Sequence, residues 1–235
     1  MSDIVLTHPR ERSWRRHELL SVAPRFWRSE LASRPADPAT PFLATWVDNG
    51  WPVIVRRRMA DDDRPDRIPV GVPLPPASGK MRIALTVPEQ AVLERSPPPS
   101  LLVVGHAADP AWGPAIRALV ALGARYGVSP TAFGSLFWQY RTGLPYLSPR
   151  SDLDVLWPVR ADCEIGALVA GIAAAERGAP MRIDGEVVFP NGEAVNWREL
   201  HLALNQDGPT EVLAKSIGGL RLLDVSRAPR TWRAA

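Results

Sequence analysis

The alternation of apolar and polar positions changes its period after a proline-rich run near the middle of the chain. Beyond that run, short strand-like stretches are separated by segments with apolar residues at helical spacing. One such segment carries Ile165, Leu168, Val169 and Ile172 on a single face and is followed by Gly178, a residue that often ends helices. The pattern predicts strands at 101–105, 152–159, 181–189, 212–217 and 220–225, and helices at 111–126, from 165 to the glycine stop, and at 195–204.

The part of the chain before the proline run is rich in Pro and Arg and has only short apolar stretches. Those at 51–55, 68–72 and 81–87 contain β-branched residues and are bounded by turn residues, so they predict short strands. The run Pro97-Pro98-Pro99 is typical of a stiff linker. We therefore expect an α/β (α+β) protein with a small mixed domain ahead of a mixed β-sheet with flanking helices, divided as 1–96 and 97–235.

Composition narrows the class of protein further. Of 28 basic residues only Lys80 and Lys215 are lysines, and the net charge is +3. Arginine binds phosphate oxygens in pairs, although a genome biased toward arginine codons is the simpler explanation. The small cationic excess argues against a general nucleic-acid binder. The single Cys163, the lack of an apolar leader and a longest apolar run of only 11 residues at 165–175 predict a disulfide-free cytoplasmic protein without a membrane segment.

Two aspartates spaced for one face of a strand give the clearest chemical signal. Asp152 and Asp154 are two residues apart, so their carboxylates point the same way and repel each other unless a cation lies between them. Oxygen ligands of this kind suit Mg²⁺, with Mn²⁺ as the alternative. A third carboxylate from a later strand would allow a second metal about 4 Å away, as in phosphoryl transfer. Asp184 and Glu186 both qualify, and the Ile183 beside Asp184 favours the aspartate.

A glycine–serine pair ahead of these aspartates adds a candidate phosphate site. Gly134-Ser135 would offer backbone N–H groups and a hydroxyl to phosphate oxygens at the N-terminus of a helix. The segment that follows is rich in aromatic residues and arginine. Within it Phe137 is interpreted as a core residue, and the predicted phosphate ligands are Arg141, Thr142 and Arg150.

Several stretches of the sequence resemble one enzyme family. Gly134-Ser135, Thr142-Gly143-Leu144-Pro145-Tyr146 and Ser151-Asp152-Leu153-Asp154 are together far more specific than the two aspartates alone. In these stretches the chain resembles the malonate decarboxylase holo-acyl-carrier-protein synthases, also called phosphoribosyl-dephospho-CoA transferases, of the nucleotidyltransferase superfamily. The resemblance extends over most of the chain, and further similar stretches lie at 16–20, 70–76, 79–82, 184–186 and 196–200.

The sequence departs from the family pattern at two points. Glu18 stands in the opening stretch Arg16-His17-Glu18-Leu19-Leu20 where aspartate is expected. In addition, 16 residues separate Ser135 from Asp152, a wider gap than nucleotidyltransferases commonly have. By that comparison we expect an inserted loop between them.

The resemblance implies a nucleotidyltransferase-like catalytic domain and a specific group transfer. The family moves phosphoribosyl-dephospho-CoA from 2'-(5''-triphosphoribosyl)-3'-dephospho-CoA to a serine of the apo acyl-carrier protein of malonate decarboxylase and releases diphosphate. On that mechanism Asp152 and Asp154 would hold Mg²⁺ on the attacked phosphate, and Asp184 would help to activate the serine. Gly134 and Ser135 would bind the departing diphosphate.

The basic residues then have a second explanation beside codon usage. They would bind the phosphates of the donor or steer an acidic carrier protein toward the enzyme. Lys215 is the predicted phosphate ligand among them. The other candidates are the clusters Arg15-Arg16 and Arg56-Arg57-Arg58, together with Lys80 and Arg82.

Two other functions stay open on the sequence alone. The chain would also suit a nucleotidyltransferase that uses an ordinary nucleoside triphosphate on a small molecule or another protein. It would equally suit a non-catalytic binding module in which the aspartates only cap structural elements. The choice of donor distinguishes the first alternative, and a lack of Mg²⁺ binding would favour the second.

Overall fold

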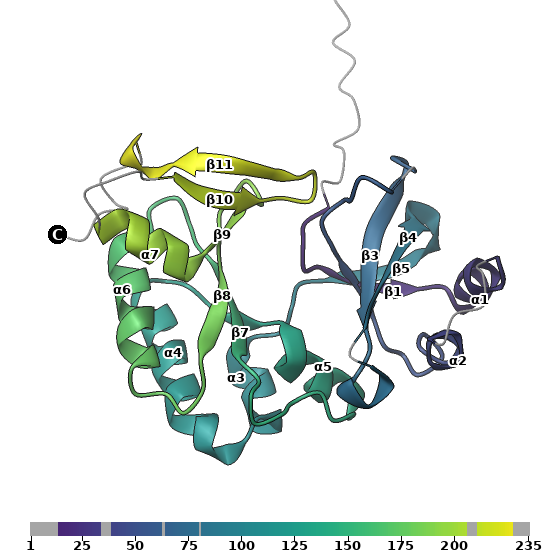
Figure 1. The fold of residues 1–235 in the computed structure, drawn as a ribbon, viewed down its shortest axis with the longest axis horizontal. Coiled ribbons are helices and arrows are strands. Elements are labelled where there is room, and N and C mark those ends of the chain that lie inside the picture. The colour runs from purple at the N-terminus through teal and green to yellow at the C-terminus, as the bar shows by residue number, and fades with distance from the viewer. Residues whose placement is uncertain (1–13, 34–38, 63, 80, 206–210, 228–235) are drawn as a thin grey trace, which may run out of the picture.

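The computed structural model describes residues 14–33, 39–62, 64–79, 81–205 and 211–227. These residues form two β-sheets with helices packed on their outer sides, and residues 97–99 connect the two halves (Figure 1). The separate sheets and helices confirm the α+β class. Within the described ranges, no helix is both long enough and apolar enough to cross a membrane.

The first sheet is antiparallel and comes from the chain before the proline run. Its elements are β1 (Leu19–Val22), α1 (Pro24–Ala32), α2 (Thr40–Ala44), β2 (Val53–Val55), β3 (Arg67–Pro73), β4 (Arg82–Pro88) and β5 (Val92–Ser96). The strand order is β4-β3-β2-β1-β5, with α1 and α2 at one side of the sheet (Figure 1). The three predicted strands are confirmed as β2, β3 and β4, whereas β1, β5 and both helices were not predicted.

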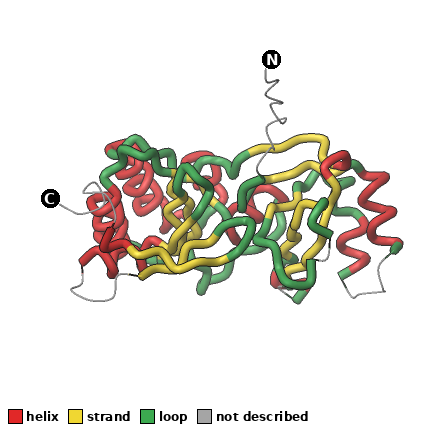
Figure 2. Tube along the Cα trace, turned by 90° about the horizontal axis from the view of Figure 1, so that it is seen from above, coloured by secondary structure: helices red, strands yellow, loops and turns green. Residues whose placement is uncertain are grey.

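The second sheet has six strands and is mixed. Its half of the molecule contains α3 (Leu101–Val104), α4 (Gly113–Arg125), β6 (Thr131–Ala132), α5 (Gly134–Thr142), β7 (Leu153–Pro158), α6 (Ile165–Glu176), β8 (Ile183–Val188), β9 (Ala194–Asn196), α7 (Trp197–Asn205), β10 (Glu211–Lys215) and β11 (Leu220–Asp224). The strand order is β11-β10-β9-β8-β7-β6. Only β7 and β8 run parallel, because α6 forms the crossover between them. Helices α4, α6 and α7 lie on the side away from the first sheet, whereas α5 lies toward it (Figure 1), and Figure 2 shows the two halves from above.

One of the predicted strands is wrong. Residues 101–105 were expected to form a buried strand, but they begin with the short helix α3. The hydroxyl of Ser100 accepts a hydrogen bond from the backbone N–H of Val103 at 3.3 Å, which caps the first turn. Leu101 and Val104 are buried while Leu102 is exposed, and this i, i+3 burial is helical. A short apolar run carries too little periodicity to distinguish the two structures.

The two hydrophobic cores meet at α5. Phe137 and Trp138 on this helix, and Tyr146 after it, belong to the core of the first sheet rather than the second. The Trp138 ring lies 5.5 Å from that of Trp46, and the Tyr146 hydroxyl donates a hydrogen bond to the carbonyl of Pro73 at 2.9 Å. Residues 136–142 of the expected inserted loop therefore belong to α5, which packs one half of the molecule against the other. Phe137 is confirmed as a core residue.

Candidate active site

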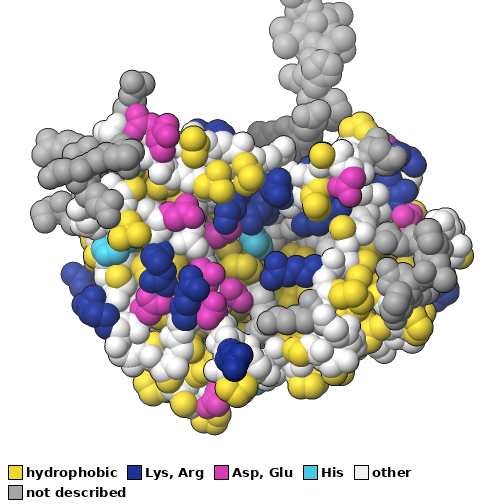
Figure 3. Space-filling model, in the orientation of Figure 1, with side chains coloured by type: hydrophobic (Ala, Val, Ile, Leu, Met, Phe, Trp, Pro, Cys, Tyr) yellow, Lys and Arg dark blue, Asp and Glu magenta, His cyan; other side chains and the backbone are white. Residues whose placement is uncertain are grey.

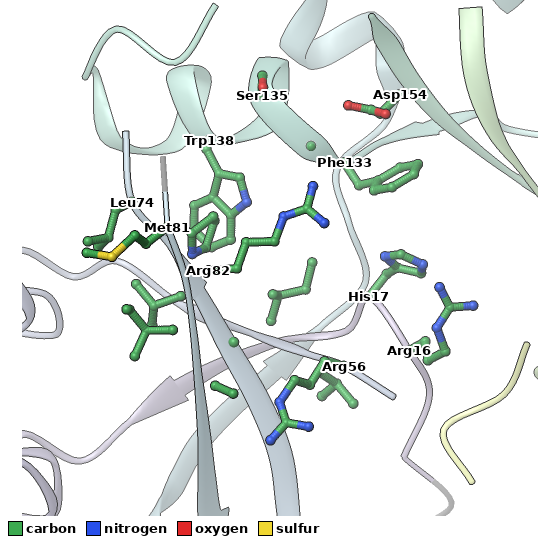
Figure 4. A pocket seen from close by; sticks show the side chains of 18 of the residues that line it. Arg16, His17, Arg56, Leu74, Met81, Arg82, Phe133, Ser135, Trp138 and Asp154 are labelled. Carbon is green, nitrogen blue, oxygen red and sulfur yellow. The ribbon is translucent and has the colours of Figure 1, made fainter. Parts of the chain in front are cut away.

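A cavity of about 420 Å³ lies between the two sheets. Strands β2, β3 and β4 form one wall, and the start of α5 with Asp154 of β7 forms the opposite wall. Basic side chains and a histidine gather in the hollow between the two halves (Figure 3), and the described residues that line the cavity include His17 and the basic residues Arg16, Arg56, Arg57, Arg82 and Lys215. Figure 4 shows Arg82 extending into this space from the first half, while Ser135, at the start of α5, lines it from the second half.

Gly134 and Asp154 approach each other more closely than any other residue type would allow. Gly134 has φ +64°, and a Cβ atom at this position would lie 1.8 Å from Oδ2 of Asp154. The backbone N–H of Ser135 donates a hydrogen bond to the same carboxylate. The predicted glycine–serine pair therefore begins α5, as expected, and lies directly against the second aspartate of the acidic pair.

The three predicted acidic residues lie in one electrostatic neighbourhood. Asp154 and Asp184 occupy paired positions on the parallel strands β7 and β8. Burial, followed by the charges of Asp184 and Asp152, raises the pKa of Asp154 to about 7. Asp184 accepts hydrogen bonds through Oδ1 from Asn196 Nδ2 at 3.0 Å and from the Gly185 N–H at 2.8 Å. Asp152 is partly exposed, and its carboxylate lies 3.9 Å from Arg182 Nη1.

The fit of a metal ion to these acids has two sides. Their carboxylate oxygens are the ligands that Mg²⁺ prefers, and a cation would relieve the repulsion that raises the pKa of Asp154. However, among the residues that the structure describes, no three His, Cys, Asp or Glu side chains are arranged to hold one ion. The carboxylates of the three aspartates are therefore suitable ligands for a metal ion, but the ion would need further oxygen ligands from other groups.

Glu186, the other candidate for the third carboxylate, is already neutralised. Arg16 binds its two oxygens with Nη1 and Nη2 at 3.0 and 3.2 Å, and Lys215 Nζ lies 3.2 Å from Oε1. His17 Nε2 lies 3.2 Å from Oε2. Burial would raise the pKa of Glu186, but the hydrogen bond from His17 and the charge of Arg16 hold it well below its usual range. This engagement favours Asp184 over Glu186 as a metal ligand.

The predicted phosphate ligands divide into two groups. Lys215 lines the cavity together with Gly134 and Ser135, although its ammonium group is shared with Glu186. The other three do not line the cavity: Arg141 donates to the carbonyl of Gly50, Thr142 to that of Trp138, and Arg150 is exposed at the surface. The structure therefore does not support Arg141, Thr142 and Arg150 as phosphate ligands, and this role stays a prediction from the sequence.

The sequence analysis predicted no role for His17, which belongs to a stretch that resembles the family. Arg57 and Arg82 were predicted, among the basic residues, to bind the donor's phosphates or to steer the carrier protein. All three line the cavity, and burial lowers the pKa of His17, so its ring is neutral at pH 7. The sequence signal for His17 and Arg82 was their place in the stretches at 16–20 and 79–82, which both resemble the family. Because these two stretches lie far apart in sequence, their common resemblance to one family points to a shared site. Lys80 lies outside the described residues.

The fold and this site together define a class of protein. An α+β chain holds a glycine-started helix, a serine and an aspartate around a cationic cavity, and this arrangement suits a transferase that acts on phosphate-bearing substrates.

Comparison with known proteins gives the family. Residues 15–98 match the N-terminal domain, and residues 100–226 the C-terminal domain, of phosphoribosyl-dephospho-CoA transferase MdcG. A phosphoribosyl-dephospho-CoA transferase of Bradyrhizobium diazoefficiens is 42% identical over 209 residues, which cover 89% of each chain. One of Xanthomonas campestris pv. campestris is 38% identical over 205 residues, covering 87% of this chain and 91% of the relative. The chain belongs to the phosphoribosyl-dephospho-CoA transferase family and is a transferase. No solved structure matches it.

The contact between Gly134 and Asp154 leads to a first prediction. Gly134→Ala is expected to lower the transfer rate about 100-fold, because its methyl group must displace the carboxylate. Gly143→Ala is the matched control: Gly143 ends the same helix with φ +72°, and no atom lies within 4 Å of a Cβ there. Both variants should lose about 1–2 kcal/mol of stability to backbone strain, measured by thermal unfolding. Equal transfer rates for the two variants would contradict the role of this contact.

Proposed function

We propose that the chain transfers the phosphoribosyl-dephospho-CoA group from 2'-(5''-triphosphoribosyl)-3'-dephospho-CoA to a serine of the apo acyl-carrier protein of malonate decarboxylase. The observation that carries this proposal is the Asp154 carboxylate, held against Gly134 and Ser135 in a cationic cavity of a chain from this family. We place the reaction in the cytoplasm, where a chain whose single Cys163 is free and buried needs no disulfide.

The transfer exchanges a phosphoanhydride bond of the donor for a phosphodiester bond to the carrier. The serine oxygen bonds to the phosphorus attached to the donor's ribose, the bond from that phosphorus to the diphosphate breaks, and the serine proton passes to a base. Asp184 is the proposed base, because both of its hydrogen bonds use Oδ1 and none that involves another described residue uses Oδ2. The N–H groups at the start of α5, with Ser135, would receive the departing diphosphate.

The acidic residues are the proposed metal site. Asp152 and Asp154 would hold Mg²⁺, or Mn²⁺ in its place, with Asp184 as the third carboxylate. When bound, the ion would neutralise charge on the phosphates of the donor. The part played by this chain is to place the carboxylates, the helix N-terminus and the cationic wall around one space, so that little reorganisation accompanies the reaction.

Mass spectrometry of the carrier protein tests the proposed function. Apo acyl-carrier protein incubated with the enzyme, MgCl₂ and the triphosphoribosyl donor is expected to gain the mass of one phosphoribosyl-dephospho-CoA group. A carrier whose acceptor serine is replaced by alanine should gain nothing. Transfer of a nucleotide from ATP, with the triphosphoribosyl donor inactive, would overturn the proposed donor. No modification with either donor would favour a non-catalytic binding module.

A further inference from the structure

The five-stranded sheet presents a flat floor to the cavity. Ile54 on β2, Gly71 on β3 and Ala84 on β4 lie side by side in register, and all three line the cavity. Gly71 has no side chain and Ala84 only a methyl group, so the sheet itself borders the cavity at these two positions, with the side chains of Ile54 and Arg56 beside Gly71. Trp138, whose ring is fixed against Trp46 at 5.5 Å, lines the same space. Such a surface suits a planar group that lies flat on it.

Arg82 stands beside this floor with its charge uncompensated. It is two residues from Ala84 on β4, so the two side chains leave the same face of the strand. Figure 4 shows its guanidinium group extending across the cavity on the side of Ser135 and Phe133. Its charge reaches Asp154, whose pKa it helps to lower. Within the described part of the chain, no carboxylate or hydrogen-bond acceptor engages Arg82.

Three other cations of the cavity differ from Arg82 in this respect, whereas the side chain of Arg57, which also lines the cavity, has no hydrogen-bond or ion-pair partner among the described residues. Arg16 and Lys215 share Glu186, and Arg56 is paired with Asp62 at 2.8 Å. These three groups therefore have their charges balanced before any ligand binds. A phosphate that enters the cavity would find unsatisfied guanidinium groups at Arg82 and Arg57, which can each pair with it through two hydrogen bonds. Of these two, Arg82 is the one whose charge acts on Asp154, on the side of the cavity where transfer is proposed.

We propose that the five-stranded sheet is the donor-binding half of the active site. The adenine of the donor lies flat over Gly71 and Ala84, and Arg82 binds the diphosphate that joins the adenosine to the pantetheine arm, so that the triphosphoribosyl group is directed toward Ser135. This inference rests on the proposed function and assigns a role to the stretches at 70–76 and 79–82, which the acidic site leaves unexplained. The first half of the chain then recognises the donor, and the second half carries out the transfer.

Calorimetric titration of the full chain with dephospho-CoA, in the presence of MgCl₂, tests this assignment. Gly71→Val should weaken binding at least about tenfold, because the new side chain fills the floor. Its Cβ would meet its nearest neighbours at 3.8–3.9 Å, ordinary contact distances, and β-branched residues suit strands, so we expect the fold to persist. Ala84→Val fills the same floor from the adjacent strand if Gly71→Val fails to fold. Gly178→Val is the matched control, since no atom lies within 4 Å of a Cβ there.

Arg82→Ala should weaken dephospho-CoA binding about 10- to 100-fold, the loss expected for a charged hydrogen-bonding partner. Arg28→Ala, which removes an exposed arginine paired with Asp48 on the outer side of the same half, should bind as the unaltered chain does. ATP carries the same base, so its binding should also fall in Gly71→Val. Binding of 4'-phosphopantetheine, which has a phosphate but no base, should fall in Arg82→Ala only.

Three results would overturn the inference. The first is that neither Gly71→Val nor Arg82→Ala weakens the binding of dephospho-CoA. The second is that Gly71→Val weakens the binding of 4'-phosphopantetheine as strongly as it weakens the binding of ATP. The third is that the unaltered chain does not bind dephospho-CoA. The titration needs no carrier protein and no turnover. If the proposed function is wrong, the carrier protein stays unmodified although the enzyme binds dephospho-CoA. If this inference is wrong, the carrier protein is modified, but Gly71→Val and Arg82→Ala bind dephospho-CoA as tightly as the unaltered chain does.

Discussion

Asp154→Asn is expected to reduce transfer at least about a thousandfold. The substitution keeps the size of the side chain and an oxygen that can accept the Ser135 N–H, but it removes the charge at the point where the phosphates would react. The rate of carrier modification under saturating donor and MgCl₂ measures the effect. Because Asn cannot replace a carboxylate as a metal ligand of full charge, added Mg²⁺ should not restore the rate.

Asp162→Asn provides the control for this variant. Asp162 is an exposed acid paired with Arg160 at 3.2 Å, and it does not line the cavity. The Asp162→Asn variant changes the net charge by the same amount as Asp154→Asn, and we expect it to transfer the group at the rate of the unaltered chain. Near-normal transfer by Asp154→Asn would show that the acidic pair is not the catalytic centre.

Asp154→Asn should also make the metal-free protein more stable. Burial and the neighbouring charges of Asp184 and Asp152 raise the pKa of Asp154 from 3.8 to about 7. Between these values the folded chain binds more protons than the unfolded chain, so Asp154 costs stability as the pH rises. In EDTA at pH 8 we expect Asp154→Asn to gain up to about 4 kcal/mol, a gain that shrinks as the pH approaches 4. A variant that loses both activity and stability would instead indicate a structural role.

Glu186→Gln is expected to destabilise the protein by about 3 kcal/mol. Glu186 is 6% exposed and joins His17, Arg16 and Lys215, so its loss leaves two cations beside the cavity without a counter-charge. The melting temperature should fall by about 6–12 °C. Asp66→Asn, which breaks an exposed pair with Arg64, should change the unfolding free energy by less than about 0.5 kcal/mol.

The pH dependence of unfolding separates this charge effect from a change of packing. The pKa of Glu186 lies below its usual value of 4.5 in the folded chain, so its contribution is present at neutral pH and is lost as the pH falls below about 4.5. The stability difference between the unaltered chain and Glu186→Gln should therefore narrow in acid. A difference that is constant down to pH 3 would contradict a role for the charge.

Local pattern was sufficient for much of the second half of the chain. The stripe of Ile165, Leu168 and Val169 predicted α6, and the spacing of Asp152 and Asp154 placed both at the start of a strand, as β7 confirms for Asp154. These features depend on which face of one element turns toward a core, and neighbours in sequence decide that. The apolar run at 101–105 was misassigned because its burial depends on what packs against it, which sequence spacing does not specify.

The sequence alone determined most strands and helices of the second half of the chain, the acidic pair, the glycine–serine turn and the family resemblance, all of which are properties of short stretches. Tertiary structure decided which side chains share the cavity. Arg16 reaches Glu186 across 170 positions, while Arg141, close to the acidic pair in sequence, turns away toward Gly50. The face of a strand is set within a few residues, whereas the meeting of two sheets is set by how their cores pack around α5. For that reason the aspartates and the glycine–serine pair could be recognised in the sequence, whereas the position of strands β2, β3 and β4 opposite them could not.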